Sequence, residues 1–187
     1  MNILIVGVGG QGTLLASRVL GGLAVIENKD CKLSEVHGMS QRGGSVVTHV
    51  KIADKVYSPI IAVGEADIIL SFEELEAIRW QHFLKKDGVI VCNTQKIDPM
   101  PVIIGKADYP SDILEKIENS GKKVIAVDAL KIADELGNPK TLNVVMLGVL
   151  AKKLDINFED MKKALLNVVK PKFAEINLKA LERGYNY

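Results

Sequence analysis

Short apolar runs alternate with helical patterns over most of the chain. The first run, residues 3–6, has the length and branching of a buried strand, and Leu14, Leu15 and Val19 follow it with helical spacing. Similar runs predict strands at residues 31–37, 67–72, 88–93 and 123–128, with helices at residues 73–84 and 111–120. This alternation predicts an α/β fold with a Rossmann-like, open and mostly parallel sheet.

Two segments depart from this rhythm. β-Branched and polar residues alternate over residues 45–52, a turn is predicted at residues 53–54, and a second strand-like run follows at residues 55–60. We therefore expect an antiparallel hairpin inserted into the parallel sheet. Residues 99–110 contain three prolines, and residues 102–104 between them are predicted to form a short edge strand.

Residues 139–187 are predicted to be helical. Residues 141–151 are almost unbroken in apolar character, which predicts either a fully buried helix or an interface helix. Asn143 is the polar exception and is predicted to be a helix cap, with a ligand contact as the alternative. Two more helices are predicted at residues 158–169 and 171–183, and the last four residues are expected to be loose.

A glycine-rich turn separates the first strand from the first helix and matches G-x-G-x-x-G at Gly7, Gly9 and Gly12. Glycine takes positive φ without a Cβ clash and lets a phosphate come close. The first amides of the following helix are unpaired and lie at the positive end of its dipole. We predict that a phosphate-bearing cofactor binds this turn through Gly7, Gly9, Gly10, Gln11 and Gly12.

Two other interpretations of the turn stay open. The glycines could serve only to allow a tight turn and close helix–sheet packing. A NAD(P) site would need an acidic residue about 20 positions on, at the end of the second strand. Glu35 is the only candidate there, and it comes before the predicted strand end. The inserted hairpin, which replaces a helix, also weighs against a dinucleotide fold.

Polar residues follow the carboxyl ends of two strands, the sheet edge where open α/β folds bind ligands. The second strand leads into a polar loop, residues 37–44, with three glycines. His37 is placed there for a chemical role, and Arg42 offers an exposed planar donor to a partner or a phosphate. Asn93 and Thr94 end a later strand, so we expect them to contact the same cofactor.

The composition excludes several classes of protein. The 187 residues suit one domain, with an α/β core over about residues 1–138 and C-terminal helices over about 139–187. With 24 basic and 23 acidic residues, the net charge of +1 does not attract nucleic acid. Cys31 and Cys92 lie in apolar runs and are too few for an iron–sulfur cluster, which needs about four thiolates. With no leader and no apolar run of about 18 residues, we expect a cytoplasmic chain that does not contact a membrane.

No serine elbow, metal cluster, carboxylate pair or Cys–His arrangement is visible in the sequence. We therefore predict no catalytic residue in this chain, apart from a contribution from His37 or Arg42, and no metal ligand. The site looks like half of an active site, completed by another chain.

Four segments of the sequence resemble a known family. They read VGVGGQGTLLASRVLG, SEVHGMSQRGGSVVTHVKI, YSPII and ADIILSFEELEAIRW. Together they resemble the γ-type domain of the 2-oxoacid:ferredoxin oxidoreductases, and within that family the β subunits of the indolepyruvate enzymes. The resemblance covers about residues 1–150 and is strongest in the first 95.

The resemblance implies a heteromeric complex in which a large α subunit holds thiamine diphosphate and the iron–sulfur clusters. The implied reaction is oxidative decarboxylation of an arylpyruvate with coenzyme A, giving aryl-acetyl-CoA, carbon dioxide and reduced ferredoxin. It places the coenzyme A phosphates near Gly9–Gly12. It also directs one loop toward the α subunit, formed by Met39, Ser40, Gln41, Arg42, Gly43 and Gly44.

Other functions remain open at this point. Because no indole pocket is visible, the chain could be the γ subunit of a pyruvate or branched-chain 2-oxoacid oxidoreductase. A stand-alone NAD(P)-binding protein and a purely structural subunit are the alternatives from other classes. A subunit without its partner would leave an apolar face open, so we expect the isolated chain to self-associate.

Overall fold

The computed structural model describes residues 1–35 and 43–187, and six strands in these ranges form one sheet in the order β2-β3-β1-β4-β5-β6. The strands are β1 (Asn2–Val8), β2 (Asp30–Glu35), β3 (Ser45–Ala53), β4 (Ala66–Ser71), β5 (Leu84–Asn93) and β6 (Lys123–Val127). The helices are α1 (Thr13–Ile26), α2 (Glu74–Trp80), α3 (Met100–Ile103), α4 (Ile113–Asn119), α5 (Ala129–Glu135), α6 (Leu142–Lys153), α7 (Phe158–Val168) and α8 (Ala174–Tyr185). Single 3₁₀ turns occur at Gln81–Phe83, Pro139–Thr141 and Pro171–Phe173. Strands β1, β4, β5 and β6 are parallel, so the predicted α/β class is confirmed.

Strand β3 lies between β1 and β2 and runs antiparallel to both. Val8 of β1 lies opposite Ser45, and Glu35 of β2 lies opposite Thr48. Because both of its neighbours are antiparallel to it, β2 runs in the same direction as β1. The carboxyl end of β2 therefore lies at the same sheet edge as the glycine turn, and the predicted antiparallel insertion is confirmed.

The predicted partner of β3 in that hairpin is wrong. Residues 55–60 form no strand, and β3 pairs instead with β2, which precedes it in the chain. Both edges of β3 are taken by β1 and β2, so none remains for this segment. Side chains of β2 and β3 hold this segment in place instead of strand pairing. The Val56 amide donates to Asp30 Oδ2 at 2.9 Å, and the amide of Ile61, which follows the segment, donates to His49 Nδ1 at 3.1 Å.

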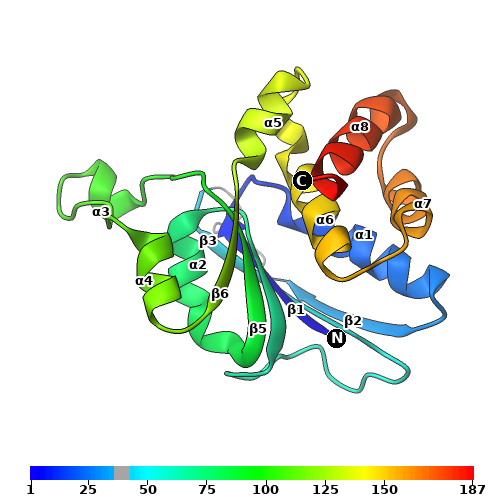
Figure 1. The fold of residues 1–187 in the computed structure, drawn as a ribbon, viewed down its shortest axis with the longest axis horizontal. Coiled ribbons are helices and arrows are strands. Elements are labelled where there is room, and N and C mark those ends of the chain that lie inside the picture. The colour runs from blue at the N-terminus through cyan, green and yellow to red at the C-terminus, as the bar shows by residue number, and fades with distance from the viewer. Residues whose placement is uncertain (36–42) are drawn as a thin grey trace.

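Helices cover both faces of the sheet (Figure 1). Helices α1, α6, α7 and α8 pack on one face, and α2 and α4 pack on the other. Alternate residues of β1 enter the two cores, Ile3 and Ile5 on the side of α1, and Leu4 and Val6 on the side of α2. A strand buried on both faces has no polar position, which explains the unbroken apolar run at residues 3–6.

Helix α6 is buried along the apolar segment singled out in the sequence, which decides between the two predictions made for that segment. Every residue from 142 to 151 is buried. The helix crosses α8 at two glycines: a Cβ on Gly148 would lie 2.3 Å from the Leu181 carbonyl oxygen, and one on Gly184 would lie 2.0 Å from the Val145 carbonyl oxygen. Since α6, α8 and the sheet share one apolar cluster, the C-terminal helices and the sheet are built around the same core.

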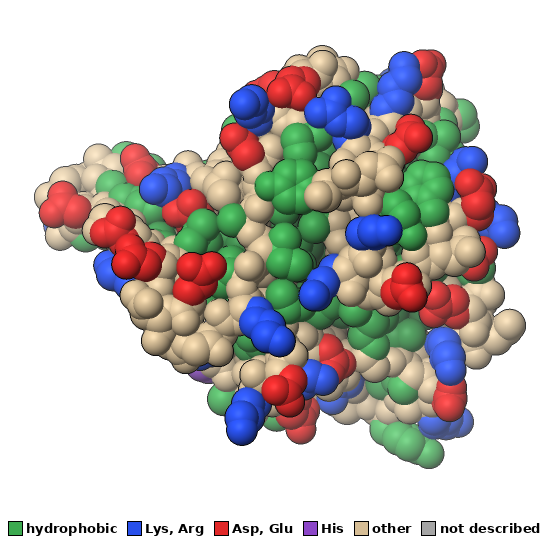
Figure 2. Space-filling view, viewed as in Figure 1, with side chains coloured by type: hydrophobic (Ala, Val, Ile, Leu, Met, Phe, Trp, Pro, Cys, Tyr) green, Lys and Arg blue, Asp and Glu red, His purple; other side chains and the backbone are tan. Residues whose placement is uncertain are grey.

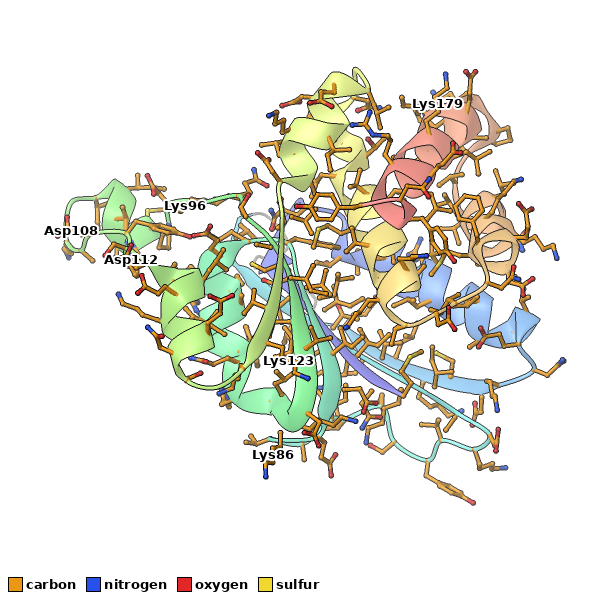
Figure 3. The ribbon with its side chains drawn as sticks, in the orientation of Figure 1. Lys86, Lys96, Asp108, Asp112, Lys123 and Lys179 are labelled. Carbon is orange, nitrogen blue, oxygen red and sulfur yellow. The ribbon has the colours of Figure 1, made fainter. Side chains whose placement is uncertain are left out.

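Residues 96–112, here called the α3 excursion, project from the body between β5 and α4 (Figure 1). The predicted edge strand at residues 102–104 is wrong, because α3 forms here with Pro101 in its first turn, where proline is tolerated. Figure 3 labels Lys96, Asp108 and Asp112 on this excursion.

One buried carboxylate fastens both ends of the α3 excursion. Glu73 Oε1 accepts a hydrogen bond from the Ile97 amide at 3.2 Å and another from the Tyr109 hydroxyl. Its Oε2 accepts from the Glu76 amide at 2.9 Å and so caps α2. Glu73 thus joins the excursion to the first turn of α2.

The end of the chain is ordered, so the expectation of four loose residues is wrong. Helix α8 continues to Tyr185, and the Tyr187 hydroxyl donates to the Ala126 carbonyl of β6 at 3.0 Å. Figure 2 shows apolar side chains reaching the surface in the middle of the view, between groups of charged ones. None of the helices in the described ranges is long and apolar enough to span a bilayer.

Candidate functional site

The glycine turn connects β1 to α1 at the carboxyl edge of the sheet. Gly10 and Gly12 have φ of 106° and 87°, values that other residues rarely adopt. Gly12 is the N-cap of α1 and provides no side-chain cap. Among the described residues, the amides of Thr13 and Leu14 have no hydrogen-bond acceptor. The turn therefore presents free backbone donors at the positive end of a helix, as an anion requires.

The Gln11 side chain folds back beneath the turn. Its Oε1 accepts from the Val8 amide at 2.8 Å, and its Nε2 donates to the Phe72 carbonyl at 2.8 Å and to Gln95 Oε1 at 2.9 Å. These bonds tie the turn to the ends of β4 and β5. Both polar atoms of the Gln11 side chain are therefore hydrogen-bonded within the fold. The predicted contact of Gln11 with a cofactor would have to be made by its backbone or its apolar side-chain atoms.

Asn93 and Thr94 lie at the predicted edge, and their contacts are structural. Asn93 is fully buried; its Nδ2 donates to the Phe72 carbonyl at 3.0 Å, and its Oδ1 accepts from the Ala129 amide at 3.1 Å. The Thr94 amide donates to the Val127 carbonyl at 2.9 Å. Their role in cofactor binding stays a prediction.

A pocket of about 470 Å³ opens between the glycine turn and the start of α6. The turn forms one wall, three apolar side chains form another, and Lys140 adds a cation. The lining residues are Gly10, Gln11, Gly12, Gln95, Leu130, Pro139, Lys140, Leu142 and Asn143. Sequence reasoning placed Gln95 at this edge, directly after Asn93 and Thr94, and missed Lys140.

A smaller pocket lies on the other side of the turn. It has a volume of about 240 Å³ and is lined by Gly9, Gly10, Gly12, Thr13, Leu14 and Val46. The two pockets share Gly10 and Gly12, so a ligand at the α1 N-terminus can be approached from either side.

Asn143 lies directly against the turn, and the prediction that it caps α6 is wrong. The N-cap of α6 is Thr141, and Asn143 lies inside the helix. Its Nδ2 donates to the Gly12 carbonyl at 3.3 Å. A Cβ on Gly12 would lie 2.1 Å from this nitrogen, so Gly12 is required by the contact as well as by its φ.

The predicted partner loop lies mostly outside the described residues. His37, Met39, Ser40, Gln41 and Arg42 fall in that gap, so their predicted roles stay predictions. Gly43 and Gly44 are described, and the Gly44 carbonyl accepts from the Gly9 amide at 2.9 Å. The end of the loop is therefore joined directly to the glycine turn.

Glu35, the candidate for ribose recognition, lies in β2 and is its last described residue, so the prediction that it precedes the strand end stays a prediction. Its carboxylate accepts a hydrogen bond from the buried Ser17 hydroxyl on α1. Because β3 separates β2 from β1, Glu35 lies two strand spacings from β1, about 10 Å, rather than one. A dinucleotide fold has its acidic residue on the adjacent strand, so this geometry argues against NAD(P).

Buried carboxylates lie beside the site at the start of α2. Burial raises the pKa of Glu74, and Lys96 at 3.6 Å opposes the shift. Burial also raises the pKa of Glu76, whereas hydrogen bonding from Ser45 and the charge of Arg79 lower it. These carboxylates are bonded within the fold and connect α2 to β3 and to the root of the excursion.

Both cysteines of the chain lie in strands of the sheet, Cys31 in β2 and Cys92 in β5. Its sequence holds only two cysteines, and burial raises the pKa of both Cys31 and Cys92, which keeps them as thiols. No group of three or more potential metal ligands occurs in the described ranges.

Comparison with known proteins gives related sequences over nearly the whole chain. Indolepyruvate oxidoreductase subunit IorB of Thermococcus kodakarensis is 43% identical over 188 residues, which cover 98% of this chain and 93% of that protein. Pyruvate synthase subunit PorC of Methanocaldococcus jannaschii is 33% identical over 184 residues, covering 96% and 92%.

The fold is also similar to that of a much longer chain. This is the 2-oxoglutarate:ferredoxin oxidoreductase from Magnetococcus marinus, solved with 2-oxoglutarate, coenzyme A and succinyl-CoA bound. The TM-score is 0.74 at 17% identity, and the match covers 100% of this chain and 30% of that one. Residues 2–187 match the family described as pyruvate ferredoxin/flavodoxin oxidoreductase. With this match and relatives of more than 30% identity, the chain belongs to the pyruvate ferredoxin/flavodoxin oxidoreductase family.

Proposed function

We propose that this protein is the small subunit of an indolepyruvate (arylpyruvate):ferredoxin oxidoreductase. The complex converts an arylpyruvate and coenzyme A to aryl-acetyl-CoA and carbon dioxide, and passes the electrons to ferredoxin. The observation that supports this substrate class is the difference in identity between the two relatives, 43% for the indolepyruvate subunit against 33% for the pyruvate subunit.

Thiamine diphosphate and the iron–sulfur clusters belong to a large partner subunit in this proposal. The two cysteines of the chain cannot hold a cluster, and the site described above has no nucleophile. In such enzymes thiamine diphosphate stabilises the carbanion that decarboxylation leaves behind. Two unpaired thiols also fit a reducing compartment, which supports a cytoplasmic location.

The glycine turn is proposed to hold the phosphates of coenzyme A. The free amides of α1 and the Lys140 side chain provide positive potential at the pocket. Two glycines with positive φ leave no side chain that would block a phosphate. The apolar wall of Leu130, Pro139 and Leu142 suits the uncharged part of such a ligand. The bound coenzyme A in the Magnetococcus marinus enzyme supports the ligand class, since that enzyme contains the same fold.

The partnership and the substrate are tested by co-expression with a candidate large subunit. The purified complex is assayed for coenzyme A-dependent reduction of a viologen dye with indolepyruvate, phenylpyruvate, pyruvate and 2-oxoisovalerate. Preference for the aryl acids, with activity lost when either chain is omitted, is the expected result. Preference for pyruvate or 2-oxoisovalerate would reassign the substrate, and absence of a complex would refute the proposal.

The coenzyme A site is tested by Gly12→Asp in the same complex. A carboxylate at this position repels the phosphates, so coenzyme A affinity should fall by at least about tenfold while the subunits still assemble. Gly12→Ala is the matched control, because both variants place a Cβ 2.1 Å from Asn143 Nδ2 and only aspartate adds a charge. Unchanged coenzyme A affinity in an assembled Gly12→Asp complex would exclude the turn as the phosphate site.

A further inference from the structure

The Asn143 carboxamide is only half satisfied. Its Nδ2 donates to the Gly12 carbonyl, whereas its Oδ1 is buried and has no hydrogen-bond donor among the described residues. The residue as a whole is 4% exposed and lines the pocket beside the glycine turn. A buried carbonyl oxygen without a partner is costly, so native proteins seldom keep one without a reason.

Two independent features meet at this point. The N-terminus of α1, a helix of 14 residues, presents unpaired amides that attract an anion. Asn143 presents an acceptor oxygen, which an anion cannot satisfy but an N–H or O–H group can. A ligand that satisfies both features carries a phosphate, which binds the amides of α1, and a nearby neutral hydrogen-bond donor, which binds the Asn143 oxygen.

We propose that Asn143 is a specificity-determining residue of this site, whose Oδ1 accepts a hydrogen bond from an N–H or O–H group of the phosphorylated ligand held at the glycine turn. The inference rests on the proposed coenzyme A role, and the amide, amino and ribose hydroxyl groups of coenzyme A belong to this class of donor. Because the oxygen is covered, a small rotation of the carboxamide toward the pocket accompanies binding. Inorganic pyrophosphate has the charge but lacks the amide, amino and ribose hydroxyl groups of coenzyme A, so Asn143 distinguishes the two.

The test compares two probes on the full-length chain in complex with its large subunit. Coenzyme A and inorganic pyrophosphate are titrated calorimetrically into the parent complex and into complexes carrying Asn143→Leu or Asn143→Ala. Leucine has the branching and the number of side-chain heavy atoms of asparagine but a larger volume, and alanine removes any risk of overpacking beneath Gly12. Coenzyme A affinity should fall about five- to tenfold in both variants, the usual effect of one neutral hydrogen bond, while pyrophosphate affinity stays within about twofold.

The control is a second buried asparagine outside the site. Asn177 on α8 is 8% exposed and donates through Nδ2 to the Phe173 carbonyl at 2.8 Å, the same kind of bond that Asn143 makes to Gly12. Asn177→Leu should lower the melting temperature without changing the affinity for either probe. This separates the loss of a buried amide from the loss of a ligand contact.

Each outcome bears on the proposal. Equal losses for coenzyme A and pyrophosphate would show that Asn143 only shapes the turn, and unchanged coenzyme A affinity would show that its oxygen contacts no ligand; either result overturns the inference and leaves the proposed function standing. Failure of the parent complex to bind coenzyme A would overturn both the coenzyme A role and the inference.

Discussion

At the scale of single residues, the glycine turn was visible in the sequence but its support was not. The spacing of Gly7, Gly9 and Gly12 predicts a turn of this type from local geometry alone. The contacts that hold it come from far along the chain: Gln11 bonds to Phe72, 61 residues away, and Asn143 bonds to Gly12, 131 residues away. Such contacts depend on the tertiary arrangement of strands and helices, which no local pattern contains.

Gly12→Ala should destabilise the protein more than its backbone conformation alone requires. A left-handed alanine costs about 1–2 kcal/mol, and its Cβ would also lie 2.1 Å from Asn143 Nδ2. We expect a loss of about 3 kcal/mol or more in the free energy of unfolding, measured by urea denaturation. Gly64→Ala, where φ is positive and no atom lies within 4 Å, should show only the backbone cost; equal losses in the two variants would contradict the close contact.

His49 should make stability depend on pH in the weakly acidic range. Burial, followed by the charge of Lys51, lowers the pKa of His49, whose Nδ1 accepts from the Ile61 amide. The unfolded state therefore binds the proton more readily than the folded state. The stabilisation is complete above the ordinary histidine pKa of about 6.5 and is lost as pH falls from there toward the lowered value.

Melting curves between pH 5 and 8 for the parent and for His49→Gln test this dependence. Glutamine keeps an acceptor for Ile61 but does not titrate. The raised pKa values of Glu74 and Glu76 act in the opposite direction in both proteins, so the difference between the two curves isolates His49. Parallel curves would show that the His49 proton does not affect folding.

At the scale of secondary-structure elements, the long apolar and amphipathic segments were predicted well and the short ones poorly. The strands and helices that bury whole faces carry a pattern that depends on burial itself, an unbroken apolar run in β1 and a helical periodicity in α7. Residues 55–60 and 102–104 have strand-like composition, yet neither pairs with a strand of the sheet. Which segments join the sheet depends on the tertiary arrangement, which short-range patterns do not determine.

Replacing a helical glycine by alanine should have opposite effects on stability at the crossing of α6 and α8 and on α1. Gly148→Ala should lower the free energy of unfolding by about 2–3 kcal/mol, because its Cβ would lie 2.3 Å from the Leu181 carbonyl and 2.6 Å from the Tyr185 amide nitrogen. Gly21→Ala on α1 should instead be neutral or stabilising by up to about 1 kcal/mol, because its Cβ would meet only Leu33 Cδ1 at 3.6 Å. Both are measured by chemical denaturation, and destabilisation of similar size at the two sites would refute the close helix crossing.

At the scale of the whole molecule, the described surface leaves large apolar side chains uncovered. Met100 and Ile103 on α3 are 64% and 65% exposed, and other apolar residues reach the surface elsewhere (Figure 2). Surfaces of this kind commonly mark contacts with other proteins. Exposed apolar side chains of this kind are expected on a small subunit whose surface is covered by a larger partner.

We therefore predict that the isolated chain self-associates and that the large subunit prevents it. Sedimentation velocity of the isolated chain should show species larger than the monomer, in amounts that increase with concentration. The co-purified complex should instead sediment as one species of fixed composition. A monomeric isolated chain at all concentrations, unaffected by salt, would contradict the prediction.

The attachment of the α3 excursion has a mechanical consequence. Both of its ends are tied to Glu73, and Glu73 is joined by one peptide bond to Phe72, whose carbonyl holds Gln11 and Asn93 beneath the glycine turn. The excursion is thus anchored at the start of α2, by Glu73 and by the ion pair between Lys96 and Glu74. A force on its tip would reach the Phe72 carbonyl beneath the pocket through these contacts, which would connect docking at the periphery to the shape of the anion site.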